Sequence, residues 1–175
     1  FFIRHSAGLG KSPTEKDPDI YDHRNIHCDV LVVGAGISGI LAAKNAAKNN
    51  FKTLLIDEKN ELGGATIYQN KEFNKINNQS SSDWIKKEIN ELKNISNLEI
   101  KTRTSVAAYH AYNYLLAREN LTDHLEKKDK NNKVRQRLLK IRAKKVILAT
   151  GALERPLIFN NNARPGIMLS TAVKK

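Results

Sequence analysis

Six residues near the start of the chain, Gly34-Ala35-Gly36-Ile37-Ser38-Gly39, match the spacing GxGxxG. In such a turn the first glycine permits a tight bend, and the second lets backbone approach a pyrophosphate without a Cβ in the way. The third glycine lets a helix pack close to a strand, and the start of that helix offers free N–H groups to phosphate. The pattern predicts a phosphate-binding turn that includes Gly34, Gly36, Ile37, Ser38 and Gly39.

An acidic pair follows the glycines at the distance expected for a dinucleotide site. Asp57 and Glu58 come about 20 residues later, directly after the apolar run from Thr53 to Ile56. Carboxylates at this place accept hydrogen bonds from the hydroxyl groups of an adenosine ribose, and they repel a 2′-phosphate. The pair therefore favours NAD or FAD over NADP and leaves the choice between NAD and FAD open.

Two later stretches could bring backbone close to the same nucleotide. Gly63 and Gly64 follow the acidic pair, and their missing side chains would let that loop run close to a bound ligand. Thr150 and Gly151 follow an apolar run, and ligands of open α/β sheets bind beyond the carboxyl ends of the strands. We expect all four residues to contact the cofactor.

The site requires a strand, a helix and a second strand around the motif. Val30 to Val33 are all apolar, as in strands that are buried on both faces of a parallel sheet. Apolar residues at helical spacing predict a helix from Ile37 to Lys48, which Asn49 and Asn50 would end. A second buried strand is expected at Thr53 to Ile56, joined by a right-handed crossover.

The later part of the chain is predicted to contain a loop, a helix and further strands. Glu61 to Ser80 is rich in small polar residues and is expected to be a loop, and an amphipathic helix should run from about Ser81 to Leu92. Leu98 to Ala107 and Val134 to Ile141 are expected to be strands with a polar connection between them. Val146 to Ala149 should form a last buried strand.

These elements predict an α/β fold, namely a Rossmann-like FAD/NAD(P)-binding domain with a parallel sheet and an inserted antiparallel β-meander. Residues 1–27 lack periodicity and contain glycines and prolines, so we expect a lead-in segment or interdomain linker, with structure beginning at Asp29. Residues 28–175 would then be the dinucleotide-binding domain. Because the chain begins with Phe1 and stops just after a run that looks structured, we expect an incomplete domain from a longer protein.

Composition narrows the classes of function. The chain is 40% hydrophobic and 27% charged, and no apolar run approaches the roughly 20 residues of a membrane-spanning helix, so a globular chain without a membrane partner is expected. The net charge of +12 comes from lysines and arginines scattered among polar residues. This scatter favours a solvated basic surface over a nucleic-acid partner.

The chain offers no catalytic constellation of its own. Cys28 is the only cysteine, which excludes an internal disulfide and a CxxC redox pair and favours a reducing compartment, the cytoplasm. The five histidines are scattered, so neither a metal site nor a Ser/His/Asp arrangement is assigned. Any redox chemistry would belong to the cofactor, which the protein would bind and orient.

Longer strings of the sequence resemble one family. These strings are FIRHSAGLGK, DPDIYDHRNIHCDVLVVGAG, LTDHL and RQRLLKIRAKKVILATGALERPLIFNNNARPGIML. Together they resemble the alpha subunits of heterotetrameric sarcosine oxidases, within the two-dinucleotide-domain FAD/NAD-dependent oxidoreductases. The resemblance covers almost the whole chain.

The resemblance implies a multi-subunit enzyme that oxidatively demethylates sarcosine to glycine, reduces O2 to H2O2 and passes the one-carbon unit to tetrahydrofolate, forming 5,10-methylenetetrahydrofolate. It implies beta, gamma and delta subunits as partners, FAD in the beta subunit and FMN between alpha and beta. NAD would lie in the alpha subunit's Rossmann-type region, and folate would lie in a separate C-terminal domain. This stretch would then hold a nucleotide and be inactive alone.

Carried over residue by residue, the resemblance assigns Gly34, Gly36 and Gly39 to the pyrophosphate turn, with Ile37 and Ser38 inside it. Asp57 and Glu58 would hold the adenosine ribose. The neighbouring cofactor contacts would be Gly63, Gly64, Thr150 and Gly151.

Three other readings remain open. The chain could belong to the alpha subunit of a related amino-acid or opine dehydrogenase, or of hydrogen cyanide synthase. A thioredoxin-reductase-like NAD(P)/FAD oxidoreductase would share the fold, although the chain has no CxxC pair. A basic nucleic-acid-binding module is the third alternative, and it would predict strongly salt-dependent affinity for DNA.

Overall fold

The computed structural model describes residues 3, 6–8, 14–68, 75–126 and 133–173. Its elements, in chain order, are β1 (Ile20–Val33), α2 (Ile37–Lys48), β2 (Thr53–Ile56), the 3-10 helix η1 (Gly64–Tyr68), β3 (Lys75–Ile76), β4 (Gln79–Ser80), α3 (Ser81–Lys93), β5 (Leu98–Lys101), β6 (Thr104–His110), the 3-10 turn η2 (Ala111–Asn113), β7 (Tyr114–Asn120), β8 (Val134–Leu148) and α4 (Ser170–Val173).

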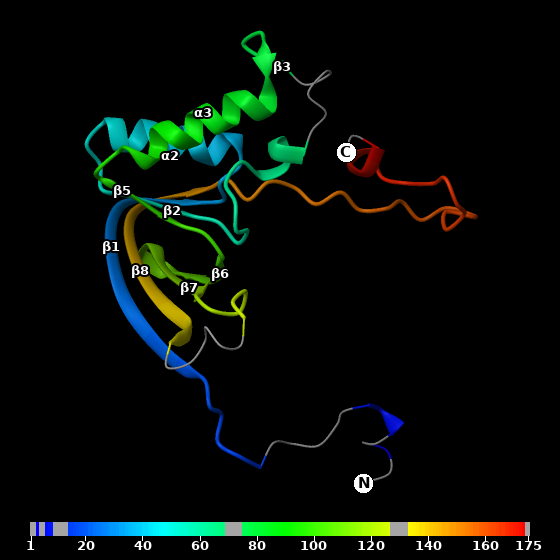
Figure 1. Ribbon diagram of the computed structural model, residues 1–175, viewed down its shortest axis with the longest axis horizontal. Helices are drawn as coiled ribbons and strands as arrows, with labels where there is room; N and C mark the ends of the chain where they lie inside the picture. Colours follow the sequence, from blue (N-terminus) through cyan, green and yellow to red (C-terminus); the bar gives the residue numbers. More distant parts are fainter. Residues whose placement is uncertain (1–2, 4–5, 9–13, 69–74, 127–132, 174–175) are drawn as a thin grey trace.

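Most of the described strands form one mixed sheet. Its order is β5-β2-β1-β8-β7-β6, and β3 pairs separately with β4 as a small hairpin. β5, β2, β1 and β8 run parallel, whereas β7 and β6 join the edge of β8 in antiparallel pairing. The long strands β1 and β8 curve together, so that β6 and β7 lie beneath β2 and β5 in Figure 1. This is the expected parallel sheet with an antiparallel β-meander.

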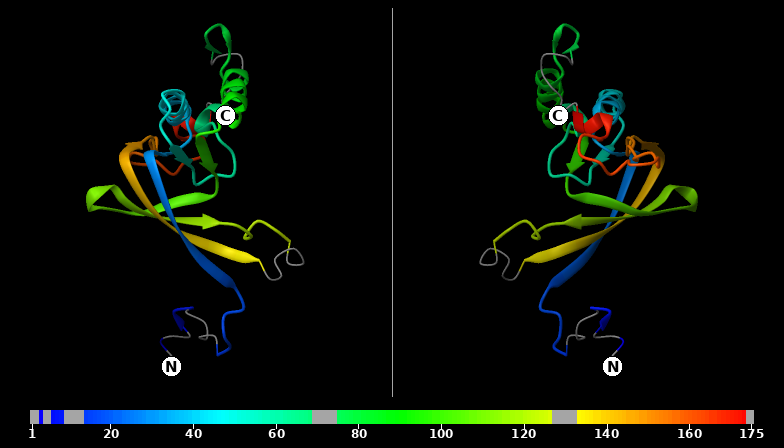
Figure 2. Two further views of the ribbon diagram at one scale, coloured as in Figure 1. Left: turned by 90° about the vertical axis from the view of Figure 1, so that its left-hand side faces the viewer. Right: turned by 90° about the vertical axis from the view of Figure 1, so that its right-hand side faces the viewer.

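Two apolar clusters fill the two sides of the parallel strands. α2 and α3 cover one side, as Figures 1 and 2 show, and their cluster contains Val32, Ile40 and Leu55, each with no exposed surface. The second cluster lies on the meander side and contains Leu31, Ile56 and Ile141, which are also fully buried. Because side chains alternate along a strand, neighbours such as Leu31 and Val32 enter opposite clusters.

The strand-helix-strand unit around the glycine motif is confirmed. α2 spans Ile37–Lys48 and β2 spans Thr53–Ile56, as expected. Asn50 takes a φ of 61°, the left-handed conformation that ends a helix. β1 and β2 pair in parallel from Val30–Thr53 to Val33–Ile56, which brings the carboxyl ends of both strands to the same edge of the sheet.

The expectation that structure begins at Asp29 is wrong, because β1 already starts at Ile20. Residues 20–28 pair in parallel with β8 from Val134 to Ala143. Their side chains are mostly exposed, so this half of the strand lacks the apolar run that marks Val30–Val33. Backbone pairing with β8, not burial of side chains, makes it a strand. The expected lead-in segment therefore contributes to the sheet.

Three strand predictions also need correction. The stretch expected as one strand from Leu98 to Ala107 is two strands, β5 and β6, separated where Arg103 takes a φ of 51°. β7, which follows η2, was not expected at all. The two strands expected near the end of the chain are one continuous strand, β8, since β1 pairs with all of it.

The end of β8 is more exposed than its sequence predicts. Ile147 is 37% exposed and Leu148 is 60% exposed, although Val146 to Ala149 were expected to form a buried strand. β7 pairs with β8 only as far as Arg142, so among the described residues the last part of β8 has β1 on one edge and no strand partner on the other. The helix expected from about Ser81 to Leu92 is confirmed as α3. The loop expected before it also contains η1, β3 and β4.

Candidate functional site

Two glycines of the motif are required by packing. Gly34 has a φ of +98°, and a Cβ at this position would collide with the carbonyl oxygen of Ala149, just beyond β8. A Cβ at Gly39 would collide with the carbonyl oxygen of Gly34 and lie 3.4 Å from the Cβ of Ala149. These two positions therefore bring β1, α2 and the end of β8 into close contact.

Gly36 differs from the other two because a Cβ there would meet nothing within 4 Å. It is the N-cap of α2, with φ −71° and ψ −174°, and α2 has neither a side-chain cap nor an acidic residue in its first turn. The first turn of a helix leaves N–H groups without intrahelical partners. Open space above Gly36 and uncapped N–H groups are the requirements for an anion at this end of the helix.

Asp57 contacts the glycine turn directly. The backbone N–H of Ala35 donates to Asp57 Oδ2 at 2.6 Å, and the backbone N–H of Lys59 donates to Asp57 Oδ1 at 2.8 Å. Asp57 is half-buried, whereas the next residue, Glu58, is exposed. The two acids that sequence reasoning treated as a pair therefore have different surroundings.

The loop at Gly63 and Gly64 packs against the same turn. The N–H of Gly63 donates to the carbonyl oxygen of Ala35 at 2.7 Å. Gly63 has a φ of +114°, and a Cβ there would lie 2.7 Å from a side-chain carbon of Ile67. A Cβ at Gly64 would approach the Cα of Gly36 to 3.1 Å, so the loop runs close to the turn because these glycines lack side chains.

A cavity of about 760 Å³ lies at the carboxyl ends of β1, β2 and β8. It is lined by Val33, Gly34, Gly36, Ile56, Asp57, Glu58, Lys59, Gly64, Ala65, Thr104, Ser105, Val106, Ala149, Thr150, Gly151, Ala152, Leu153 and Arg155. Of the residues assigned from sequence, the structure brings Gly34, Gly36, Asp57, Glu58, Gly64, Thr150 and Gly151 into this lining. Ile37, Ser38, Gly39 and Gly63 lie behind or beside it, in the turn, the helix and the adjoining loop.

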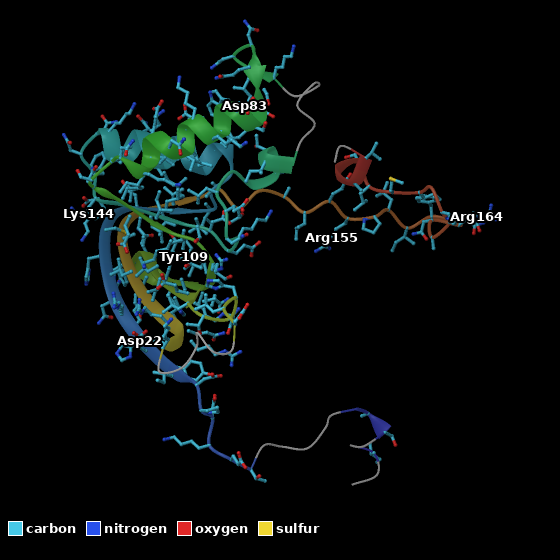
Figure 3. All side chains as sticks on the ribbon, viewed as in Figure 1. Asp22, Asp83, Tyr109, Lys144, Arg155 and Arg164 are labelled. Atoms are coloured by element: carbon cyan, nitrogen blue, oxygen red, sulfur yellow. The ribbon has the colours of Figure 1, made fainter. Side chains whose placement is uncertain are left out.

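Sequence reasoning missed several lining residues. Thr104, Ser105 and Val106 begin β6, and no motif marks them. They reach the cavity because β5 pairs with β2 and the N–H of Thr104 donates to the carbonyl oxygen of Asp57 at 2.8 Å. Lys59 follows the acidic pair, and Arg155 follows Thr150 and Gly151. Their positive charge beside a predicted nucleotide site was the signal that could have identified them. Arg155 lies on the extended segment that leaves β8, as Figure 3 shows.

Other kinds of site find no support in the part of the chain that the structure describes. Cys28 is buried, and burial raises the pKa of its thiol to about 11, so it is protonated at neutral pH and a poor nucleophile. Within the described ranges, no group of three or more His, Cys, Asp or Glu side chains could hold a metal ion. Among the same residues, none of the helices has the length and apolar character needed to cross a membrane.

Similarity to known proteins agrees with this geometry. Residues 28–172 match the model of the family described as pyridine nucleotide-disulphide oxidoreductase. In the solved structures, the chain resembles L-proline dehydrogenase from P. horikoshii with a TM-score of 0.62 and 27% identity, over 82% of this chain and 26% of that one. Thioredoxin reductase from T. acidophilum, with a TM-score of 0.51 and 20% identity over 78% of this chain and 40% of that one, shares the fold alone.

The curated relatives cover the chain more completely. Sarcosine oxidase subunit alpha from Corynebacterium sp. (strain P-1) is 41% identical over 95% of this chain, and the one from Rhizobium meliloti (strain 1021) is 36% identical over 98%. The chain spans 17% of the length of each relative. By the family model over residues 28–172, it belongs to the pyridine nucleotide-disulphide oxidoreductases, as a Rossmann-like part similar to sarcosine oxidase alpha subunits.

Proposed function

We propose that the cavity at the ends of β1, β2 and β8 holds the adenosine diphosphate part of a dinucleotide, NAD, with FAD as the alternative. One observation carries this proposal: no atom lies within 4 Å of the position that a Cβ of Gly36 would take, at the uncapped start of α2. Gly36 lines the same cavity as Asp57 and Glu58. A pyrophosphate would lie over the turn, and the ribose would lie toward the acids.

The residues present fit such a ligand. Gly34 and Gly39 allow the turn to lie against β8, and Gly36 leaves room for phosphate oxygens. Gly64, Thr150 and Gly151 line the remaining wall, as expected for cofactor contacts. When bound, the dinucleotide would supply hydride or electron transfer. The residues of this chain would bind and orient its adenosine half, and none of them is assigned a catalytic role.

For the whole protein, we propose the alpha subunit of a sarcosine oxidase. The support is 41% and 36% identity to two such subunits over nearly the whole chain. The complex would oxidatively demethylate sarcosine to glycine, with formation of H2O2 and 5,10-methylenetetrahydrofolate. Beta, gamma and delta subunits would be its partners, with FAD and FMN held elsewhere in the complex and tetrahydrofolate in a domain outside this chain.

Two further points complete this proposal. This chain by itself would be inactive, because the groups that act on sarcosine would lie outside it. The protein would be cytoplasmic, which a single cysteine in 175 residues favours over an oxidising compartment.

The test uses the full-length protein in its native complex. Nucleotide released by denaturation is identified by absorbance and mass, and sarcosine-dependent oxygen consumption is measured on the intact complex. We expect one NAD, or one FAD, assigned to this subunit, and the variant Gly36→Ala should lose it because the new Cβ would occupy the phosphate position. Asn25→Ala, an exposed change in β1 that lies outside the cavity lining, is the control. Full nucleotide content in Gly36→Ala would contradict the site, and a complex that ignores sarcosine would contradict the substrate.

A second candidate is an amino-acid dehydrogenase subunit. The TM-score of 0.62 and 27% identity to L-proline dehydrogenase favour it. The same complex would then reduce an artificial electron acceptor with L-proline as the electron donor, and sarcosine would be a poor substrate. A substrate panel on the purified complex separates the two functions, while the nucleotide site remains the same in both.

A further inference from the structure

We propose that Asp57 and Glu58 perform different tasks: Asp57 holds the glycine turn in shape, and Glu58 selects the ribose of the dinucleotide. This inference rests on the proposed function, because it assigns roles within the same site. It departs from the fingerprint spacing, which gives the ribose contact to the first acid after β2.

The hydrogen bonds of Asp57 carry the first half of the proposal. One carboxylate oxygen accepts from the N–H of Ala35 at 2.6 Å, and the other accepts from the N–H of Lys59 at 2.8 Å. Ala35 has no exposed surface, so its N–H has no access to water in place of the carboxylate. Both oxygens of Asp57 are thus directed at the protein's own backbone.

The carbonyl group of Ala35 is also held by a hydrogen bond. The N–H of Gly63 donates to the carbonyl oxygen of Ala35 at 2.7 Å, and Gly64 packs beside Gly36. Ala35 is therefore held from both sides by residues that follow β2. We call Asp57 and Gly63, which together fix Ala35, the turn clamp. Because Ala35 lies between Gly34 and Gly36, the clamp sets the position of the backbone that would face the pyrophosphate.

Glu58 has the opposite surroundings. It is exposed, lines the cavity, and makes no hydrogen bond or ion pair with any residue that the structure describes. Its carboxylate is free to accept from ribose hydroxyl groups and would repel a 2′-phosphate at the same place. The neighbouring Lys59 also lines the cavity, so a neutral residue at 58 would leave a cation near the ribose.

The experiment compares two matched carboxylate-to-carboxamide changes, Asp57→Asn and Glu58→Gln, in the nucleotide-free full-length protein. The melting temperature is measured without ligand, and the Kd is measured for ADP-ribose and for 2′-phospho-ADP-ribose. The ADP portion of these probes is common to NAD and FAD, so the result does not depend on which of them is the natural ligand.

Asp57→Asn replaces one of the two acceptor oxygens by an NH2 donor, so one of the backbone N–H groups held by Asp57 loses its acceptor. We therefore expect the melting temperature to fall by about 5 °C and the affinity for both probes to fall by the same factor. Asp57→Glu, which keeps both acceptor oxygens, should restore part of both losses. Glu58→Gln should leave the melting temperature unchanged and reduce the preference for the unphosphorylated probe about tenfold. Where Asp57→Asn does not fold, Asp57→Glu takes its place.

The roles of the two acids would be reversed if Asp57→Asn changed the ratio of the two Kd values, for ADP-ribose and 2′-phospho-ADP-ribose, and Glu58→Gln did not. That result would overturn the proposal. An unchanged melting temperature in Asp57→Asn would overturn the clamp. If wild-type protein binds neither probe, the proposed nucleotide site fails and the role of Glu58 falls with it. The melting temperatures still decide the role of Asp57 in that case.

Discussion

The two halves of β1 share one partner strand but are stabilised in different ways. From Cys28 to Val33 the strand lies between the two apolar clusters, and Leu31 and Val32 have no exposed surface. From Ile20 to His27 the side chains are mostly exposed, and the contacts with β8 include ion pairs such as Asp22 with Arg137. We call these the inner and outer halves of β1.

The difference matters for the nucleotide site because only the inner half ends in it. Burial of apolar side chains contributes about 1.5–3 kcal/mol for each large residue, whereas ion pairs near the surface typically contribute about 0–1 kcal/mol. The glycine turn follows directly from the part of β1 that is held most firmly. Damage to the inner half should therefore affect stability and the site together, and damage to the outer half should affect neither strongly.

The largest effect is expected at the end of the inner half. Gly34→Ala and Gly39→Ala each place a Cβ into a backbone carbonyl group, so we expect losses of about 4 kcal/mol in the free energy of unfolding, or failure to fold. Urea denaturation of the full-length protein measures this. Ser38→Ala, exposed in the same turn, should change the unfolding free energy by less than about 0.5 kcal/mol. Near wild-type stability in both glycine variants would contradict the packing described for the turn.

A smaller loss is expected inside the strand itself. Leu31→Ala removes a fully buried side chain from the inner half and should cost about 3 kcal/mol. Asn25→Ala removes an exposed side chain from the outer half of the same strand and should cost less than about 0.5 kcal/mol. Equal losses in the two variants, measured by the same denaturation, would remove the distinction between the halves.

The outer half should respond to pH instead. Arg137 donates to both carboxylate oxygens of Asp22, at 2.7 and 2.9 Å, and this hydrogen bonding lowers the pKa of Asp22 below its usual value. A lowered pKa in the folded state contributes stability that is present above about pH 4 and is lost as the pH falls further. Asp22→Asn should therefore be less stable than wild type at pH 7 and equal to it at the acid end of the range. A difference that persists undiminished in acid would argue against this pair.

The last prediction concerns the reactivity of Cys28, which lies at the boundary between the two halves of β1. Burial raises the pKa of Cys28, at the start of the inner half, to about 11, so iodoacetamide should alkylate it roughly 100-fold more slowly at pH 7.5 than an exposed thiol. Mass spectrometry of the Cys28 peptide gives the rate, and the denatured protein provides the reference for full reactivity. Rapid alkylation of the native protein would place the boundary further along the strand.

The same contrast explains what the sequence could predict. The apolar run from Val30 to Val33 has a clear pattern, so the end of β1 at Val33 and the bounds of α2 and β2 could be predicted to the residue. The outer half reads IYDHRNIH, in which charged and apolar residues do not alternate regularly, and only its pairing with β8 makes it a strand. Its extent depends on a partner more than one hundred residues away, as the separation of 115 between Asp22 and Arg137 shows.

The site was predictable to the same degree. Motif spacing located Gly34, Gly36 and the acids, because these contacts are local to one strand-helix-strand unit. It could not assign Thr104 to the cavity, since that placement depends on the pairing of β5 with β2 and on the hydrogen bond from the N–H of Thr104 to the carbonyl oxygen of Asp57. Nor could it separate Asp57 from Glu58, because that difference depends on which of the two side chains faces the backbone of Ala35.

The parallel pairing of β1 with β8 also determines the order in which the chain can fold. β1, α2 and β2 are close in sequence and can form early, whereas β8 must be synthesised before the other edge of β1 is covered. Until then a nascent chain would present an open edge of β1, with unpaired backbone groups that can join a strand of another molecule. The rate at which the ribosome delivers residues 134–148 would then limit how long the new protein is exposed to aggregation.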